Sequence, residues 1–318
     1  MLKYLIVQLD DTSTSFCHYN NISTEKRLIE PEVLEKGVLW AMKENLTIQY
    51  LYPDYKLPDE YREIINRTYH ADIVSNKCTA TDLVKNADVV VFDNWEELSK
   101  YNFIEKQAYV IRTTLTDLLD NENTLSAILP KLNRLNVTIT DIAGFSREND
   151  YKVLLEKLVD VVAEEYKKGH NVQLNILTDR ILLNSMNNCN AGVESITLAP
   201  DGKFYVCPAF YCDNRDRFSI GDVDSGLDIK NPQLYRLDHA PICRNCDAWQ
   251  CRRCVWINRK LTLEVNTPGH EQCVMAHLER NASRKMLNNL VRVGLYIPEK
   301  GIPAINYLDP FEDLIKKQ

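Results

Sequence analysis

The chain has 318 residues, 45% of them hydrophobic and 26% charged, and its formal net charge at pH 7 is −7. This composition excludes disordered, collagen-like and coiled-coil chains, and the negative charge argues against a protein that binds nucleic acid by overall electrostatics. No apolar run approaches the roughly 18 residues of a membrane helix, and the first residues lack the pattern of a secretion signal, so we expect a cytoplasmic protein with neither a membrane nor a nucleic-acid partner.

Short apolar segments alternate with helical patterns over the first half of the chain and somewhat beyond. Strands are predicted at residues 4–9, 48–51, 87–92, 108–111, 137–139 and 172–176, and helices at 31–46, 59–67, 123–135 and 151–168. Gly169 suits the position that ends the last of these helices. Strands that alternate with helices are typical of parallel βαβ units, and about six units fit before residue 184. The pattern fits both a partial (β/α) barrel and an open doubly wound sheet.

The pattern changes after about residue 185, where helical periodicity stops. Residues 195–207 alternate on both sides of a Pro-Asp-Gly turn and are predicted to form a β-hairpin. A helix is predicted from residue 274 to about residue 293, and residues 309–318 form a short polar tail that we expect to be a terminal cap. We therefore expect an α/β domain over 1–185, a cysteine-rich domain over 186–280 and a C-terminal helical extension over 281–318.

Cysteine is the unusual component of this sequence. There are ten cysteines, and eight of them fall between Cys189 and Cys273. Ten thiols in a chain of this length are too dilute for a disulfide scaffold, and clustered thiols in a reducing compartment are usually metal ligands. Four of them form the group Cys243-x2-Cys246-x4-Cys251-x2-Cys254, which is crowded for a single tetrahedral zinc ion. The spacing favours two iron–sulfur centres over structural zinc, which remains the alternative.

Basic residues lie beside or between these cysteines, at Arg244, Arg252 and Arg253. Thiolates around a metal cluster leave net negative charge, and nearby cations stabilise that charge and raise the reduction potential. A zinc finger on nucleic acid would also have basic residues here, but the net charge of −7 argues against it.

The cysteine spacing resembles that of SPASM domains, the auxiliary-cluster domains of radical S-adenosylmethionine (SAM) peptide-modifying enzymes. The resemblance rests on Cys-x12-Gly-x4-Cys, the packed four-cysteine group and the lone downstream cysteine, and it covers residues 189–280. The segments Ile-Thr-Leu-Ala-Pro-Asp-Gly-Lys and Ser-Ile-Gly-Asp-Val also resemble the hairpin and the following turn of that domain. The packed group departs from the family, which usually has spacings of five and three where this chain has four and two.

The resemblance implies two 4Fe-4S clusters. By the family pattern, one cluster is bound by Cys243, Cys246, Cys251 and Cys273. The other is bound by Cys189, Cys207 and Cys254. Its fourth ligand varies in the family; Cys212 is the candidate here, and the alternative is an open iron site that accepts a substrate group.

A radical SAM enzyme carries Cys-x3-Cys-x2-Cys in the loop after its first strand, and this chain does not. The loop at residues 10–21 has one cysteine, Cys17. One thiolate does not hold the cluster that binds SAM, so we expect a degenerate, partial (β/α)6 radical-SAM-like barrel that does not use SAM, followed by the SPASM domain. Such a pseudo-enzyme resembles the CXXX repeat peptide maturase family, whose members are encoded with a radical SAM maturase and a cysteine-repeat precursor peptide.

This resemblance implies a role in maturing a ribosomally synthesised, post-translationally modified peptide. We favour a non-radical partner that binds the precursor peptide or the radical SAM maturase and relays electrons. One alternative is a stand-alone peptide-modifying enzyme that uses an open iron site, or Cys17 as nucleophile with His18 as base. A second alternative is a zinc-stapled binding module. His270 and His277 flank Cys273 and are predicted to lie on the surface or beside a ligand.

Overall fold

The structure, a computed structural model of residues 1–318, describes the chain except at 187–188, 214–216, 296–300 and 313–318. The chain divides into two compact units. The first unit combines Met1–Phe92 with Cys189–His239, and the second combines Asp93–Asn188 with Ala240–Gln318. No helix among the described residues is long and apolar enough to cross a membrane.

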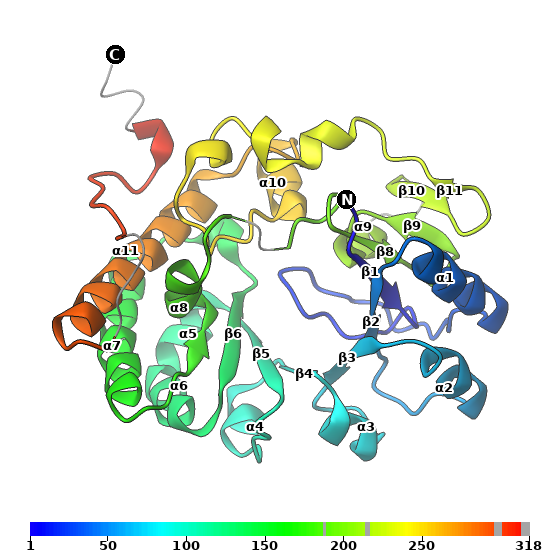
Figure 1. The fold of residues 1–318 in the computed structure, drawn as a ribbon, viewed down its shortest axis with the longest axis horizontal. Coiled ribbons are helices and arrows are strands. Elements are labelled where there is room, and N and C mark those ends of the chain that lie inside the picture. The colour runs from blue at the N-terminus through cyan, green and yellow to red at the C-terminus, as the bar shows by residue number, and fades with distance from the viewer. Residues whose placement is uncertain (187–188, 214–216, 296–300, 313–318) are drawn as a thin grey trace. The chain divides into compact units, whose positions relative to one another are not determined.

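The first unit begins with four parallel strands and the helices that connect them (Figure 1). The strands are β1 (Tyr4–Gln8), β2 (Thr47–Leu51), β3 (His70–Ser75) and β4 (Val89–Phe92), and the helices are α1 (Pro31–Lys43), α2 (Asp59–Ile65) and α3 (Thr81–Asn86). Each strand pairs in parallel with the next along the chain. Pro31 occupies the first turn of α1, where its missing N–H costs nothing.

The hairpin predicted at 195–207 joins this sheet on the other side of β1. Strand β8 (Ser195–Leu198) pairs in parallel with β1 and antiparallel with β9 (Lys203–Tyr205), and the order within the unit is β11-β10-β9-β8-β1-β2-β3-β4. Gly202, in the turn, has a φ of +77°, which glycine adopts without steric cost. The remaining elements are α9 (Pro208–Asp213), β10 (Ser219–Asp222), β11 (Gly226–Leu227) and the 3-10 turns η3 (Pro232–Tyr235) and η4 (Leu237–His239).

Among its described residues, the second unit has three parallel strands, in the order β5-β6-β7. Its first part contains α4 (Trp95–Ser99), β5 (Ala108–Thr113), α5 (Leu115–Asp120), α6 (Glu122–Ile128), η1 (Leu129–Lys131), β6 (Arg134–Ile139), η2 (Ile142–Gly144), α7 (Glu148–Lys167), β7 (Gln173–Leu174) and α8 (Asn175–Leu182). Its second part contains η5 (Cys243–Asn245), α10 (Val255–Thr262) and α11 (His270–Arg292). The two long helices α7 and α11 pack side by side (Figure 1).

The parallel α/β architecture, the hairpin and the long helices are confirmed. Several predicted elements were too long: the helix expected over 31–46 ends at Lys43 and the one over 59–67 ends at Ile65. The helix expected over 123–135 ends at Ile128, because Pro130 leads the chain through the turn η1 and on to β6. The strand expected over 172–176 ends at Leu174, because the Asn175 side chain bonds both the N–H and the C=O of Val137 and α8 begins there. Strand β3 was not predicted, since its apolar residues are confined to one end.

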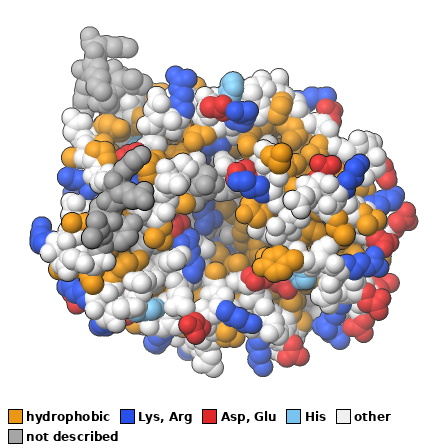
Figure 2. Space-filling model, in the orientation of Figure 1, with side chains coloured by type: hydrophobic (Ala, Val, Ile, Leu, Met, Phe, Trp, Pro, Cys, Tyr) orange, Lys and Arg blue, Asp and Glu red, His pale blue; other side chains and the backbone are white. Residues whose placement is uncertain are grey.

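Charges of both signs are intermixed on the face of the molecule drawn in Figure 2. Helix α11 continues through residues 280 and 281, and the division at 1–185, 186–280 and 281–318 stays a prediction. Of the predicted terminal cap at 309–318, residues 313–318 lie outside the described residues.

Candidate metal centre

Four of the predicted ligands come together in the second unit. Cys243 opens η5, Cys246 follows it, Cys251 lies in the loop before α10, and Cys273 lies in the first turn of α11. Burial is the main cause of the raised pKa of Cys251 and of Cys273. The charges of Cys243 and Cys246 add to the rise at both residues, and the charge of Cys251 adds to the rise at Cys273. Such interactions act over short range, so the four thiols lie near one another; that they bind one metal centre stays a prediction.

Tight turns in the loop bring these cysteines together. The N–H of Cys246 donates to the carbonyl of Cys243 at 3.0 Å, and that of Cys251 donates to the carbonyl of Ala248 at 3.0 Å. The amide N–H of Ala248 donates to the Sγ of Cys246, and that of Arg253 to the Sγ of Cys251, both at 3.4 Å. Arg253 has a φ of +43°, in the left-handed region. Backbone N–H groups of this kind orient thiolate ligands and stabilise their charge.

Burial raises the pKa of all four thiols, and together with the charge of Cys246 it raises the pKa of Cys243 to about 12. The metal-binding form of cysteine is the thiolate, so a metal that binds here must displace protons. Thiols that are hard to ionise are poorly suited to act as nucleophiles.

Two arginines from separate helices place positive charge beside Cys246. Arg280 of α11 is fully buried and binds Asp247 through two bonds, Nε to Oδ1 at 2.7 Å and Nη2 to Oδ2 at 2.6 Å. Arg180 of α8 is also buried, lies 3.3 Å from Oδ2 of Asp247, and has its guanidinium 3.8 Å from the ring centroid of Trp249. Burial raises the pKa of Cys246, and the charges of these two arginines oppose that rise. Arg280 and Arg180 together carry two positive charges and Asp247 carries one negative charge, so the group has a net positive charge beside the thiols.

The basic residues predicted beside the cysteines have different positions. Arg253 is buried, and its charge lowers the pKa of Cys243 against the effect of burial. Arg244 is exposed. The charge of Arg252 acts on Glu279. Of the three arginines predicted to stabilise the thiolates, Arg253 is the one whose charge acts on a cysteine of this unit.

His277 contacts the site directly. Its Nδ1 lies 2.9 Å from the carbonyl oxygen of Cys273 and its Nε2 lies 3.5 Å from the Sγ of Cys246. A carbonyl only accepts, so Nδ1 carries the proton and Nε2 faces the sulfur. Burial lowers the pKa of His277, which favours the neutral ring. His270 pairs instead with Asp309, Nδ1 to Oδ2 at 2.6 Å.

A buried carboxyl group lies beside the cysteines. Glu279 accepts a hydrogen bond from the hydroxyl of Tyr151 at 2.8 Å and a longer one from Nε2 of Gln250 at 3.3 Å. Gln250 also donates to the carbonyl of Ala276 at 2.6 Å, which ties the loop to α11. Burial raises the pKa of Glu279 to about 7, and its charge contributes to the raised pKa of Cys251.

The chemistry of the donor set can be compared with the two predicted kinds of metal centre. Among the described residues, no three His, Cys, Asp or Glu side chains are arranged to hold one metal ion. In a 4Fe-4S cluster each cysteine binds a different iron atom, so the sulfurs stand farther apart than around one ion. The four neighbouring thiols, with backbone N–H donors and buried arginines around them, are donors of the kind that such a cluster uses, and its binding stays a prediction.

The residues predicted for the other cluster are divided between the units. Cys189, Cys207 and Cys212 belong to the first unit and Cys254 to the second. Cys207 precedes α9 and Cys212 lies within it, while Cys254 is the residue before α10. Whether these four share a cluster stays a prediction. None of the ten cysteines, all of which are described, is in a disulfide.

The loop after β1 is closed by its own hydrogen bonds. Buried Asp11 accepts a hydrogen bond from the hydroxyl of Tyr211, which in turn accepts one from Nη2 of Arg27 at 2.6 Å. Nδ2 of Asn21 donates to the carbonyls of Asp11 at 2.7 Å and Ser13 at 2.9 Å. Cys17, the only cysteine of this loop, is half-buried. These hydrogen bonds connect the loop after the first strand with Tyr211 of α9.

Comparisons with known proteins identify the fold. No protein-family model and no curated protein matches the chain. Solved structures do match: anSMEcpe with bound AdoMet superposes with a TM-score of 0.62 and 13% identity over 91% of this chain and 98% of that chain. The chain has the fold of a radical SAM/SPASM enzyme. The anSMEcpe structures that also hold a Cp18Cys or a Kp18Cys peptide match with TM-scores of 0.60 and 0.61, at 13% and 14% identity, over 92% and 91% of this chain and 100% and 99% of theirs.

Several residues of the site were not predicted from the sequence: Arg180, Asp247, Arg280, Glu279 and Tyr151. One signal was present, because Cys273, His277 and Arg280 are spaced by four and three residues and so lie on one face of a helix. Arg180 and Tyr151 come from elements far away in the sequence, and nothing in their local pattern connects them with the cysteines.

Proposed function

We propose that the chain is an iron–sulfur protein that acts in the maturation of a ribosomally synthesised peptide as a non-radical partner of a radical SAM maturase. In this proposal Cys243, Cys246, Cys251 and Cys273 bind one 4Fe-4S cluster, and Cys189, Cys207, Cys212 and Cys254 bind the second. The observation that carries it is the gathering of the first four thiols on a radical SAM/SPASM fold.

The side chains around the first cysteine set have defined tasks in this account. The backbone N–H groups of Ala248 and Arg253 orient two of the sulfurs, and Arg280 and Arg180 supply the positive charge that offsets the thiolates. The pairing of both arginines with Asp247 fixes their positions. A bound cluster supplies one-electron transfer, and the surrounding cations favour its reduced state.

The loop after β1 supports a role without radical chemistry of its own. A SAM-binding cluster needs three cysteines there, and this loop has Cys17 alone. Asp11 at the start of this loop is instead hydrogen-bonded to Tyr211, which accepts a hydrogen bond from Arg27. We therefore propose that the chain does not use SAM, although the structures that share its fold hold AdoMet.

A peptide is the substrate class that the fold favours. Two of the solved structures with this fold hold a peptide together with AdoMet. The resemblance to the CXXX repeat peptide maturases adds a cysteine-repeat precursor peptide and a separate radical SAM maturase as partners. In this arrangement the chain binds the precursor or the maturase, and its clusters relay electrons.

The test is a reconstitution under anaerobic conditions with a synthetic precursor that carries three Cys-x-x-x repeats. The mass of the precursor is measured after incubation with the chain alone, with a radical SAM maturase, SAM and reductant, and with all of them together. We expect no modification by the chain alone and a faster reaction of the maturase when the chain is added. Equilibrium dialysis with labelled SAM is expected to show no binding to the chain.

Two results would contradict the proposal in different ways. Modification by the chain alone would establish a stand-alone enzyme, and a Cys17→Ser variant would then separate thiol chemistry from an open iron site. An unchanged maturase rate when the chain is present would remove the partner role and leave a metal-stapled binding module.

A further inference from the structure

Residues 302–309, which we call the strap, are held at both ends by side chains of α11 in the second unit. At one end, Nε of Arg284 donates a hydrogen bond to the carbonyl oxygen of Ile302 at 3.1 Å. At the other end, Nδ1 of His270 lies 2.6 Å from Oδ2 of Asp309, whose side chain is 8% exposed. The strap therefore runs antiparallel to α11, from the second half of the helix back to its first turn.

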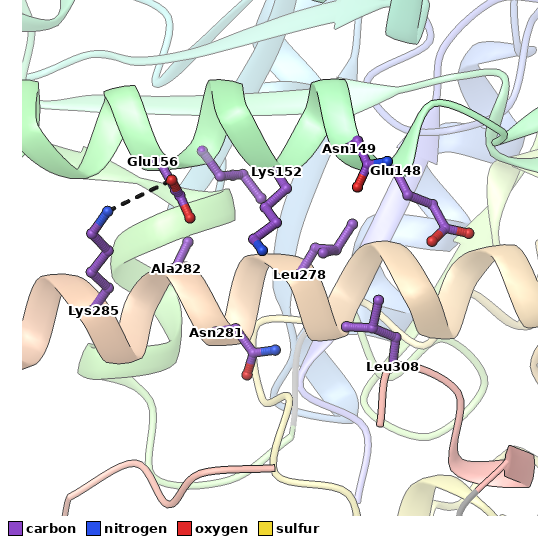
Figure 3. A pocket seen from close by; sticks show the side chains of 10 residues that line it. Glu148, Asn149, Lys152, Glu156, Leu278, Asn281, Ala282, Lys285 and Leu308 are labelled. Carbon is purple, nitrogen blue, oxygen red and sulfur yellow. Dashed lines mark ion pairs between the residues drawn. The ribbon is translucent and has the colours of Figure 1, made fainter. Parts of the chain in front are cut away.

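The middle of the strap packs on α11 between these two ends. The ring of Tyr307 meets the ring of His277 edge to face, with 5.5 Å between the two centroids. Leu308 points from the strap towards α11 (Figure 3), where it and Leu278 line a cavity of about 330 Å³ between α7 and α11. The strap is therefore in contact with the helix along its length and not at its ends alone.

The length of the strap matches the stretch of helix that it spans. The residues of α11 that hold it, His270, His277 and Arg284, follow one another at intervals of seven and so lie on one side of the helix. From the first of them to the last, the helix rises by about 21 Å. Seven steps of extended chain reach at most roughly 25 Å, so the strap is nearly extended between its two fixed ends.

The strap lies over the side of α11 that carries Cys273. This cysteine comes three residues after His270 and four before His277, on the same side of the helix. Burial is the main cause of its raised pKa, and the charge of Asp309 in the strap also contributes. His277, under the strap, is 1% exposed and has its Nε2 3.5 Å from the Sγ of Cys246. A reagent that approaches from this side must therefore displace the strap before it reaches either sulfur.

The two ends of the strap differ in how firmly they are held. Ile302 is 7% exposed, so opening this end uncovers apolar surface, which is unfavourable. The side chain of His270 is 52% exposed, so water replaces its contact with Asp309 at a lower cost. The strap therefore opens first at the contact between His270 and Asp309.

We infer that the strap is a gate over the cysteines of the second unit, latched by the contact between His270 and Asp309. While the latch holds, metal ions and small reagents reach Cys246 and Cys273 slowly. When the latch opens, the strap moves away from the cysteine side of α11 and stays attached at Arg284. The inference goes beyond the proposed function and does not depend on which metal the cysteines bind.

The test measures how fast reagents reach the cysteines of the full chain. The protein is treated with N-ethylmaleimide, and mass spectrometry follows the alkylation of each cysteine with time. Where the purified chain holds iron or zinc, release of the metal to a chelator is followed as well. A reagent that reacts with the open form alone reacts at a rate proportional to the population of that form, so both rates report on the gate.

The variants are His270→Ala, Asp309→Ala and the double variant. We expect each to raise the rate of alkylation at Cys246 and Cys273, and the rate of metal release, by roughly 10-fold, which corresponds to about 1.4 kcal/mol. The double variant should give the same rise as either single variant, because each substitution removes the same contact. Cys17, which belongs to the first unit, should react at an unchanged rate in all three variants.

Glu156→Gln is the matched control. Glu156 lies 3.8 Å from Nζ of Lys285 (Figure 3), so this substitution also removes a carboxylate that pairs with a base of α11. The pair joins α7 to α11 and involves no residue of the strap. We expect the rates of alkylation and metal release in this variant to stay within about twofold of those in the wild type.

Two outcomes overturn the inference. Unchanged rates at Cys246 and Cys273 in the His270 and Asp309 variants would mean that the latch does not control access to these thiols. A rise of the same size in Glu156→Gln, or at Cys17, would mean that the substitutions loosen the whole chain and not the strap. These results are distinct from those that test the proposed function, because a working gate on a chain without iron rejects that function alone.

Discussion

Glu279 makes the stability of this protein depend on pH in a direction opposite to that of most carboxylates. Burial raises its pKa to about 7 from the 4.5 of an ordinary glutamate. Folding therefore favours the protonated form, and the folded chain must either bind a proton from solution or ionise a buried group. This contribution is fully present below pH 4.5, is lost as the pH rises towards 7, and does not change further above that value.

The magnitude follows from the two pKa values. At 1.36 kcal/mol for each pH unit, the difference corresponds to roughly 3 kcal/mol lost between pH 4.5 and 7.5. For domains of this size, a loss of that amount lowers the midpoint of thermal unfolding by on the order of 6–12 °C. The hydrogen bonds from Tyr151 and Gln250 already oppose the rise in pKa, so their loss would increase it.

The assay compares the thermal midpoints of wild type and Glu279→Gln between pH 5 and pH 8. The glutamine cannot ionise, so the wild type should lose stability relative to the variant by roughly 2.5 kcal/mol between these two pH values. Glu164→Gln, a substitution at an exposed position of α7, serves as the control and should show no such divergence. Parallel curves for wild type and Glu279→Gln would refute the reasoning, because they would mean that Glu279 ionises normally.

Two further predictions concern charges that the fold holds in place. Replacing the fully buried Arg280 by Met leaves Asp247 paired with Arg180 alone, which should lower the free energy of unfolding by about 3 kcal/mol. The reduction potential measured by redox titration should become more negative, because a cation near the thiolates is lost. An unchanged potential would contradict the role given to this cation. Tyr211→Phe removes the hydroxyl that joins Arg27 to Asp11 and should cost about 1–3 kcal/mol in urea unfolding, whereas an unchanged free energy of unfolding would contradict the part given to this hydroxyl.

The parts of the fold that could be predicted are those with a local signal. Alternation on both sides of Pro-Asp-Gly identified the hairpin, and the apolar run at residues 4–9 identified β1. The pairing of β8 with β1 could not be predicted, because it depends on which strand edges remain available after the chain folds. Strand β7 was predicted too long for a related reason. The side chain of Asn175, and not its backbone, bonds the backbone of Val137, and this contact joins residues 38 positions apart in the sequence.

The site divides in the same way. Cysteine spacing is local, so the thiols could be identified and assigned from the family pattern. The charges around them could not, since Arg180 comes from α8 and Tyr151 from α7, and both reach the site through packing against α11. Of the basic residues beside the cysteines, sequence proximity did not distinguish buried Arg253 from exposed Arg244.

The central claim is that the four thiols of the second unit hold an iron–sulfur cluster. Its most direct test is the iron, sulfide and zinc content of anaerobically purified protein, compared with a Cys243→Ala/Cys246→Ala variant and with Cys17→Ser as control. With two clusters we predict about eight iron and eight sulfide per chain, about half of each in the double variant, and no change in the control. One or two zinc ions without sulfide, or an iron content unchanged by the double substitution, would contradict the account.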